Sequence, residues 1–339
     1  MSQRVRRDEE GGREVEFDAD IGAQLRAEVG GLFDEWKPGP EGRHLRVSRL
    51  AGGFSSININ LKVTGPATSY VLRFCLPGGG RWGIDRAAAI QAQRDAADLG
   101  LAPRIVGCSL PAGHFLAEFA DGETLTPELL RTHELIPLVA STLRVLHAGR
   151  TSAREFSPFD DLRTFLEVGA AEGAVPPRGF EDVLARCFRI EALFRNRDVP
   201  RAFCHSDLVP QNLILQGQAF KLVDFDYAGT GWIAFELASF ACHARLDGDE
   251  TEILLTSYDP RCDGSQRARV ELMRFVAGVR EATWAMMAEP ILGQATLPID
   301  GWTYKGYAEE HLRQADIAVE AGFDAYLAQA RVVAASATF

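Results

Sequence analysis

The sequence predicts an α+β protein with two lobes, a small N-terminal lobe rich in strands and a larger, mostly helical C-terminal lobe. Its 339 residues exceed what one hydrophobic core ordinarily organises. Before about residue 120, apolar residues recur mainly at every second position, which is typical of strands; after it they recur every three to four, which is typical of helices. We therefore expect an N-lobe over residues 17–120 and a C-lobe over residues 121–339.

Composition and charge place the chain among soluble globular proteins. Hydrophobic residues make up 46% and charged residues 24% of the sequence. The formal net charge of −11 argues against nucleic acid as a partner, because phosphates require a basic face. The charged start lacks the apolar segment of a signal peptide, and no later run has membrane-spanning length. We expect a cytoplasmic protein without a membrane partner.

The N-lobe is expected to contain one main helix packed against a sheet. Residues 1–16 are charged and contain glycine, so we expect a disordered tail there. A helix fits 18–36 because Ile21, Leu25 and Val29 recur every four residues. Further on, the patterns predict strands at 45–49, 57–63, 70–74, 104–108 and 114–119, and the main helix at 85–99.

The C-lobe pattern is helical, with an interruption by short strands. Thr126 and Pro127 are a typical N-cap and first helical residue, and the helix they open is expected to run towards His147. The other expected helices cover 160–170, 179–196, 249–257, 266–288 and 308–332, and short hairpins are expected over 202–223.

The stretch HSDLVPQN, residues 205–212, and the sequence DFD, residues 224–226, carry the main functional signal. Asp207 lies on the predicted loop, Asn212 closes it, and Asp224 ends the next strand. A hairpin can bring these two carboxylates and one amide oxygen to one point. Hard oxygen ligands of this kind suit Mg²⁺, which takes the rest of its ligands from water and nucleotide phosphates.

The spacing H-x-D-x-x-x-x-N followed by D-F-D resembles the catalytic loop of the protein-kinase superfamily. The form HSDLVPQN is similar to the aminoglycoside phosphotransferase and choline/ethanolamine kinase families, and LAGGFSS, VLRF and YAGTGW narrow the resemblance to the latter branch. It implies a bilobal protein-kinase-like fold with ATP and Mg²⁺ between the lobes. Asp207 would be the catalytic base, and Asn212 and Asp224 the metal ligands. His205 is expected to be a hydrogen-bonded structural residue.

The resemblance also implies a set of nucleotide-binding residues. Arg73 falls where kinases place a phosphate-binding lysine, and Ala89 stands where the helix would supply a glutamate partner for it. Glycines between two strands let backbone amides approach phosphate oxygens. The residues expected near ATP are Gly52, Gly53, Ser55, Ser56, Arg73, Glu118 and Phe119, the last two in a hinge whose backbone would meet the adenine.

The acceptor pocket is expected to include Asp207, Asp226, Glu236, His243, Glu281 and Trp284. Glu236 has two open roles, support of the catalytic loop or substrate contact, of which we favour support. Trp284 matches one of two tryptophans with which choline kinases hold a quaternary ammonium, but Glu281 occupies the other position. Since a carboxylate can hydrogen-bond an amine but not a trimethylated nitrogen, this favours an amine-bearing alcohol over choline.

The sequence therefore predicts an ATP- and Mg²⁺-dependent kinase that phosphorylates a hydroxyl of a small, cationic alcohol. The alternative within the same chemistry is an aminoglycoside or other antibiotic phosphotransferase, because both families share the catalytic loop. A catalytically weak nucleotide-binding pseudokinase stays open because of Ala89. The expected partner is a small hydroxyl-bearing molecule, and the sequence gives no indication of oligomeric state.

Overall fold

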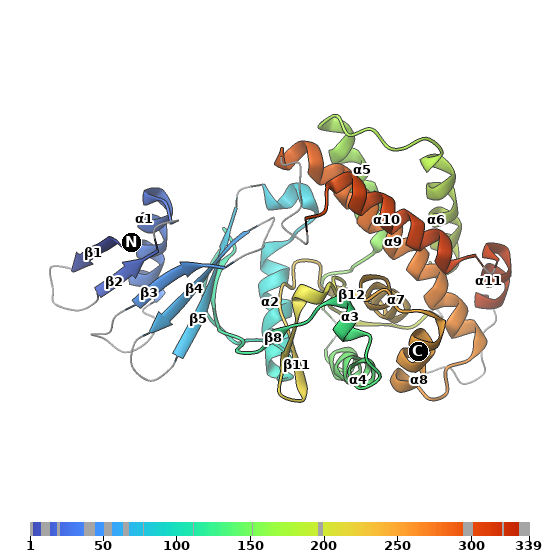
Figure 1. The fold of residues 1–339 in the computed structure, drawn as a ribbon, viewed down its shortest axis with the longest axis horizontal. Coiled ribbons are helices and arrows are strands. Elements are labelled where there is room, and N and C mark those ends of the chain that lie inside the picture. The colour runs from blue at the N-terminus through green and yellow to red at the C-terminus, as the bar shows by residue number, and fades with distance from the viewer. Residues whose placement is uncertain are drawn as a thin grey trace.

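The structure is a computed structural model of the whole chain (Figure 1). The residues that it describes are 3–7, 14–18, 21–36, 45–50, 56–63, 68–76, 78–110, 112–150, 152–195, 199–293, 301–320 and 322–331. Among them, no helix is long and apolar enough to cross a membrane.

A seven-stranded sheet forms the N-terminal part, with strand order β1-β2-β3-β4-β5-β7-β6. β2 and β3 are parallel, and the other neighbouring pairs are antiparallel. The strands are β1 (Gln3–Arg7), β2 (Glu14–Phe17), β3 (Leu45–Arg49), β4 (Ser56–Val63), β5 (Thr68–Cys75), β6 (Ile105–Ser109) and β7 (His114–Glu118).

Within residues 1–16, where a disordered tail was expected, the residues that the structure describes are two strands. β1 and β2 pair with each other, and β2 extends the sheet through Val15–Phe17 beside β3. Phe17 is buried with Val47 of β3 in the core beneath this edge. Because the pairing of β2 with β3 joins residues distant in sequence, the local composition did not indicate it.

The two faces of the sheet are covered by different helices. Val29 of α1 (Ala23–Trp36) packs with Leu72 and Leu116 on one face. Ile90 of α2 (Arg86–Asp98) packs with Phe115 and neighbouring residues on the other. Because Arg73 lies directly opposite Phe115 in the β5–β7 register, its side chain shares the α2 face.

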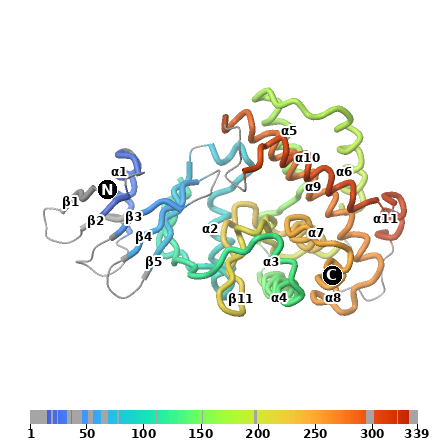
Figure 2. The backbone as a smooth tube through the Cα atoms, in the orientation of Figure 1, coloured from blue at the N-terminus to red at the C-terminus, as the bar shows by residue number. Residues whose placement is uncertain are grey.

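The C-terminal part is a helical assembly built around the long helix α9 (Gly264–Leu292). Helices α5, α7, α10 and α11 pack on it, and α4 packs against α8 (Figures 1 and 2). Their bounds are α3 (Pro127–Leu130), α4 (Leu135–His147), α5 (Pro158–Ala171), α6 (Phe180–Phe194), α7 (Ile233–His243), α8 (Gly248–Tyr258), α10 (Tyr304–Ala318) and α11 (Phe323–Ala330). Two expected helices are each divided, at 131–134 and at 319–322.

Short strands carry the loop singled out in the sequence. β9 (Arg201–Cys204) pairs with β12 (Gly229–Trp232), and β10 (Leu213–Gln216) pairs with β11 (Ala219–Leu222) and with β8 (Glu123–Thr124). The chain leaves the seven-stranded sheet after Glu118 and next pairs, at β8, with β10. HSDLVPQN therefore lies between β9 and β10, and DFD follows β11 after one intervening residue, Val223.

Candidate active site

The loop after β9 is held in shape by Glu236 from the first turn of α7. Its two carboxylate oxygens accept hydrogen bonds from the backbone N–H groups of His205 and Ser206, each at 2.8 Å. Ser206 has a φ of 67°, a left-handed conformation that is strained for a non-glycine residue, and these two bonds fix it. Glu236 is completely buried, and burial raises the pKa of its carboxyl group to about 7. Of its two expected roles, these contacts correspond to support of the loop.

His205 is a buried structural residue. Its Nε2 lies 2.9 Å from the carbonyl oxygen of Val223, and its ring packs on Phe225. Burial lowers the pKa of His205 to about 4, so the neutral ring donates the Nε2–H to Val223. This bond ties the loop to the chain just before Asp224.

Asp207, the residue after Ser206, is hydrogen-bonded to Asn212. The Asn212 side-chain nitrogen donates to the backbone oxygen of Asp207 at 2.9 Å and lies 3.4 Å from its Oδ2. Burial raises the pKa of Asp207 well above its usual range; Glu281 and Asp224 raise it further, while Arg280 opposes them. A carboxylate whose proton affinity is raised in this way is suited to accept a proton from a hydroxyl.

Arg73 of β5 reaches across from the sheet to both aspartates of DFD. Its Nη1 donates to Asp224 Oδ1 and its Nη2 to Asp226 Oδ2, each at 2.7 Å. Arg86, in the first turn of α2, lies 3.3 Å from the same Asp226 oxygen. Ala89, the residue in place of the expected glutamate, is buried. Asp226, expected in the acceptor pocket, is thus engaged by two arginines of the N-terminal part.

The oxygen atoms around Asp224 fit a magnesium ion. Asp224 has a φ of 66°, which turns it out of the strand, and its side chain is 31% exposed, more than that of Asp207 or Asp226. Because the Asn212 amide nitrogen is used by Asp207, its oxygen remains for a metal. Carboxylate and amide oxygens are the ligands that Mg²⁺ prefers.

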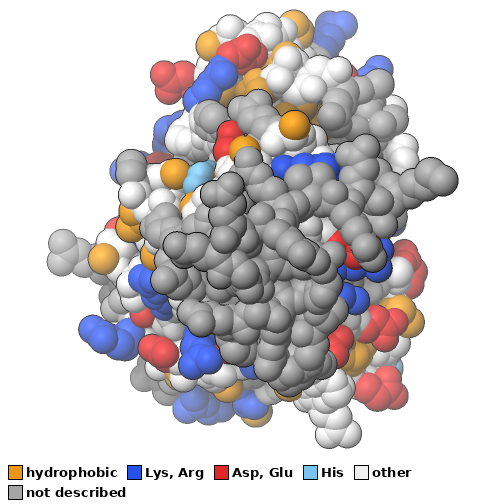
Figure 3. Space-filling model, turned by 90° about the vertical axis from the view of Figure 1, so that its left-hand side faces the viewer, with side chains coloured by type: hydrophobic (Ala, Val, Ile, Leu, Met, Phe, Trp, Pro, Cys, Tyr) orange, Lys and Arg blue, Asp and Glu red, His pale blue; other side chains and the backbone are white. Residues whose placement is uncertain are grey.

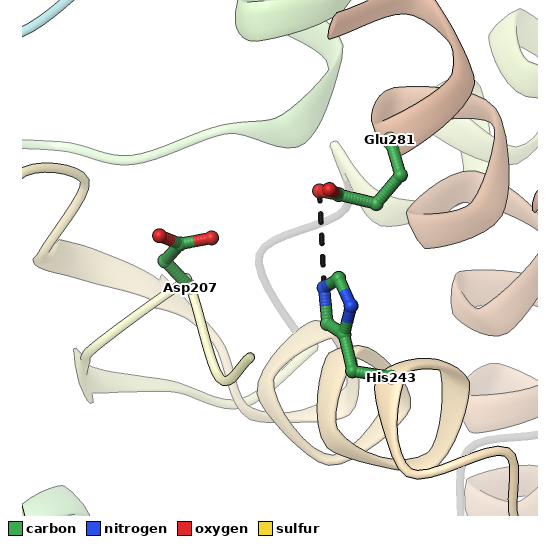
Figure 4. A group of neighbouring side chains, drawn as sticks. All are labelled: Asp207, His243 and Glu281. Carbon is green, nitrogen blue, oxygen red and sulfur yellow. Dashed lines mark ion pairs between the residues drawn. The ribbon is translucent and has the colours of Figure 1, made fainter. Parts of the chain in front are cut away.

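A second group of polar side chains converges beside Asp207. The ligand atoms of Asp207, His243 and Glu281 all lie within 4.8 Å of one another, and His243 Nε2 is 3.8 Å from Glu281 Oε1 (Figure 4). Burial lowers the pKa of His243, so the ring is neutral near pH 7. The sequence placed these three residues in one pocket, and the structure brings them together from the loop, α7 and α9.

Arg280 is the residue of this group that the sequence reasoning missed. Its Nε donates to Asp161 Oδ2 at 2.8 Å, its Nη1 donates to Glu281 Oε1 at 2.7 Å, and Nη1 lies 3.9 Å from Asp207 Oδ1. Since a cation already lies there, the Asp207, His243 and Glu281 group is a poor place for a metal ion. The available signal was a pair of adjacent charges, Arg280-Glu281, within a largely apolar run.

Trp284 lies one turn further along α9 and belongs to an aromatic group. Its ring contacts those of Tyr304 and Tyr307, with centroids 6.4 and 6.2 Å away. The Tyr307 hydroxyl donates to Glu281 Oε2 at 3.0 Å. Both oxygens of Glu281 therefore accept hydrogen bonds from the protein itself, which removes the main reason for assigning Glu281 to a substrate amine.

The expected nucleotide-binding residues are described only in part. Gly52, Gly53 and Ser55 lie outside the described residues, and Ser56 is buried at the start of β4. In the expected hinge, the N–H of Glu118 donates to Arg104 and that of Phe119 to Ser69. Both N–H groups are thus already hydrogen-bonded to backbone carbonyl oxygens of the chain. The adenine base of a nucleotide would therefore have to bind other backbone groups nearby.

The N-terminal end of the molecule presents no uniform charge on the part that the structure describes. Figure 3 shows this face, where basic and acidic side chains are interspersed around residues that are not described.

The HSDLVPQN loop and DFD both lie within a segment that matches a known protein family. Residues 46–271, more than half of the chain, match the Phosphotransferase enzyme family (APH). The chain belongs to this family. The matched segment includes Arg73, Asp207, Asn212 and Asp224 but ends before Arg280 and Glu281.

Curated relatives match about half of the chain or less. Protein LicA of Haemophilus influenzae is 25% identical over 182 residues, which cover 50% of this chain and 52% of LicA. Probable choline kinase 3 of Arabidopsis thaliana is 28% identical over 144 residues, which cover 40% of this chain and 41% of that protein. The chain thus spans about half the length or less of these two curated relatives.

Solved structures show the fold over nearly the whole chain. A choline/ethanolamine kinase family protein from Mesorhizobium loti superposes with a TM-score of 0.71 at 21% identity, covering 91% of this chain and 98% of that one. Choline kinase LicA from Streptococcus pneumoniae also has a TM-score of 0.71, at 19% identity, with 88% and 100% covered. The expected bilobal, protein-kinase-like α+β fold is confirmed, as is the resemblance to the choline/ethanolamine kinase branch.

Proposed function

We propose that this protein is a small-molecule kinase that transfers the γ-phosphoryl group of ATP, with Mg²⁺, to a hydroxyl group. The observation that carries the proposal is the arrangement of Asp207, Asn212 and Asp224, to which Arg73 reaches from the opposite lobe. Family membership and the choline kinase names of its relatives support the reaction class. A structure of LicA in complex with AMP is among the similar folds and supports a nucleotide as co-substrate.

The proposed roles follow from the positions of these side chains. Asp207, held by the Glu236-supported loop and by Asn212, would align the acceptor hydroxyl and receive its proton. Asn212 and Asp224 would hold Mg²⁺, which neutralises phosphate charge during transfer. Arg73, which bonds Asp224 and Asp226 in the structure, would turn part of its guanidinium to the phosphates. Little covalent chemistry is left to the protein, so alignment of the reactants is its main contribution.

Two alternatives share this geometry. An aminoglycoside or other antibiotic phosphotransferase would use the same loop and differ in the acceptor. A nucleotide-binding pseudokinase was suggested by Ala89, but Arg86 and Asp226 supply a connection between α2 and Arg73 that does not need the glutamate. We therefore favour an active kinase.

A screen of phosphoryl transfer tests the proposal. Purified protein is incubated with ATP and Mg²⁺ and with ethanolamine, choline, thiamine, aminoglycosides or simple polyols, and the phosphorylated product is measured directly. We expect transfer to one of these classes and its loss when EDTA removes the metal. Mg²⁺-ATP binding without transfer to any hydroxyl compound would favour the pseudokinase.

A further inference from the structure

Arg154 lies just before α5, on a stretch of backbone that is paired with β12. The N–H of Thr230 donates to the carbonyl oxygen of Arg154 at 2.8 Å, and the N–H of Phe156 donates to that of Thr230 at 3.1 Å. The two backbones approach closely at Gly229, where an added Cβ would lie 2.8 Å from the Arg154 oxygen. Because β12 pairs with β9, the strand that precedes the HSDLVPQN loop, Arg154 is fixed to the same short sheet as that loop.

The Arg154 guanidinium joins two segments that are far apart in the sequence. Its Nη1 donates to the backbone oxygen of Asp226 at 2.7 Å and lies 3.4 Å from that of Ala228. Its Nη2 donates to the backbone oxygen of Gly83 at 3.0 Å. Gly83 lies two residues before Asp85, the N-cap of α2. A planar guanidinium presents its N–H groups as a rigid fork, so it holds the two carbonyl groups at a fixed spacing.

The segment before α2 is held by the helical part at neighbouring points as well. The Tyr227 hydroxyl donates to the backbone oxygen of Trp82 at 3.2 Å. Trp82 and Ile84, together with Ala92 and Ala96 of α2, belong to the same buried core as the helices of the C-terminal part. The helix α2 therefore packs on this core as well as on the sheet.

The other end of the connection is the turn that contains DFD. The N–H of Ala228 donates to the backbone oxygen of Phe225 at 3.1 Å, which closes the turn, and Arg154 bonds the carbonyl group of Asp226 within it. Asp224 directly precedes Phe225 and has the left-handed φ of 66°. A non-glycine residue keeps this conformation only where the surrounding structure holds it. The bond from Arg154 thus helps to determine where the Asp224 carboxylate points.

We propose that Arg154 is a positioning residue for phosphoryl transfer, which holds the start of α2 and the turn after Asp224 together as one unit. The proposal rests on the proposed kinase function, in which Asp224 holds Mg²⁺. Arg154 would act through the backbone of the turn and not by touching ATP. It provides a connection between α2 and DFD that needs no side chain of α2, at whose expected glutamate position Ala89 stands. Arg86 of α2, 3.3 Å from the Asp226 carboxylate, would be placed by the same connection.

Hydrogen exchange measured by mass spectrometry tests the connection without requiring activity. In Arg154→Met we expect amide exchange to become about 10- to 100-fold faster in peptides spanning residues 78–90 and 224–232, the factor expected when a charge-assisted hydrogen bond is lost. Peptides from β6 and β7 should exchange as in the wild type. Arg178→Met removes an exposed arginine near α6 and is the control, which should change neither segment.

Nucleotide binding and kinetics test the positioning role. We expect Arg154→Met to raise the dissociation constant of Mg²⁺ with a non-hydrolysable ATP analogue, measured by calorimetry, by about tenfold. The same variant should lower kcat by about 10- to 100-fold, the loss expected when a reacting group is displaced by about 1 Å. The KM for the acceptor should stay near that of the wild type, since Asp207, His243 and Glu281 come from other segments.

Arg154→Lys keeps the positive charge but replaces two bonding nitrogens by one, so we expect an intermediate effect in each measurement. It takes the place of the methionine variant if Arg154→Met does not fold. A loss of stability alone would lower the amount of folded protein and leave the Mg²⁺ dependence of the remaining enzyme unchanged.

The outcomes separate this proposal from the proposed function. Wild-type exchange in both segments, or faster exchange in only one of them, would overturn the connection. Faster exchange in both segments with an unchanged Mg²⁺ dependence and kcat would overturn the positioning role and make Arg154 a structural residue. Absence of phosphoryl transfer from the wild-type protein to any alcohol of the wider screen would instead reject the kinase function. Hydrogen exchange and Mg²⁺-nucleotide binding would then still decide whether Arg154 positions Asp224.

Discussion

Asp207 is the single residue on which the proposed chemistry depends most directly. Asp207→Asn keeps the size of the side chain and removes its ability to take a proton. We expect the rate of phosphoryl transfer to fall by a factor on the order of 10²–10⁴, the usual contribution of a general base. The dissociation constant of Mg²⁺-ATP, measured by calorimetry, should change little, because Asn212 and Asp224 are left in place. Full turnover by this variant would remove Asp207 from the role of base.

Glu236 gives a prediction about pH at the same scale. Burial raises its pKa from the ordinary value of 4.5 to about 7, so the folded protein binds the proton more tightly than the unfolded chain. The stabilisation from this group is therefore complete below about pH 4.5 and is lost as the pH rises to about 7. The total is about 3 kcal/mol from a shift of this size.

Glu236→Gln removes this pH-dependent term and one of the two acceptors for His205 and Ser206. We expect the difference in unfolding free energy between wild type and variant to be larger near pH 5 than near pH 8, as measured by urea denaturation. Glu309→Gln, at a side chain that is 67% exposed, is the control and should show no such trend. An equal difference at both pH values would mean that Glu236 titrates at its ordinary pKa in the folded protein.

At the scale of elements, α2 is connected to the site through an unexpected residue. The sequence placed Ala89 at the glutamate position and left Arg73 without a clear partner; the structure gives Arg73 the two aspartates of DFD and adds Arg86 beside Asp226. Room for Arg86 is provided by Gly79 and Gly113, where an added Cβ would lie 2.6 Å from its side chain. The contact between Arg86 and Asp226 joins residues 140 positions apart, so the helical periodicity of α2 could not predict it.

Arg86→Met should therefore weaken the positioning of Asp226 and Arg73. We expect the KM for ATP to rise about fivefold, the effect of losing one partly buried charged contact, with a smaller change in the KM of the acceptor. Arg86→Lys should restore part of the loss. Arg94→Met, on the same helix at an exposed position, is the matched control. If both methionine variants behave alike, α2 is not connected to the nucleotide site through Arg86.

Most helices and strands could be predicted because their apolar residues follow one period. The breaks within two expected helices could not be predicted, since each depends on a short turn. The turn between α10 and α11 ends at Gly322, whose φ is 128°. In the proposed site, Asp207, Asn212 and Asp224 were predicted from their spacing. Arg280 was not, because its importance arises from Asp161 and Tyr227, which lie on other elements far away in the sequence.

On the scale of the whole molecule, Arg73 connects the seven-stranded sheet to the helical part at the point where ATP is proposed to bind. Its guanidinium is buried and bonds both aspartates of DFD, so it fixes how the sheet approaches the proposed metal ligands. Arg73→Met would leave Asp224 and Asp226 without this cation and would remove the group proposed to meet the phosphates. The lobes would then have to bind ATP with one fewer positive charge between them.

We expect Arg73→Met to raise the KM for ATP by at least about tenfold, because a charge-assisted contact of this kind contributes roughly 1.5–3 kcal/mol. The KM for the acceptor should change much less, since Asp207, His243 and Glu281 lie in the helical part. Steady-state kinetics with each substrate varied in turn measures the two effects. Arg46→Met removes an exposed arginine of β3 that pairs with Asp18 and should leave both constants unchanged. Equal increases in both constants for Arg73→Met would instead show that Arg73 holds the two parts of the fold together without a specific role towards ATP.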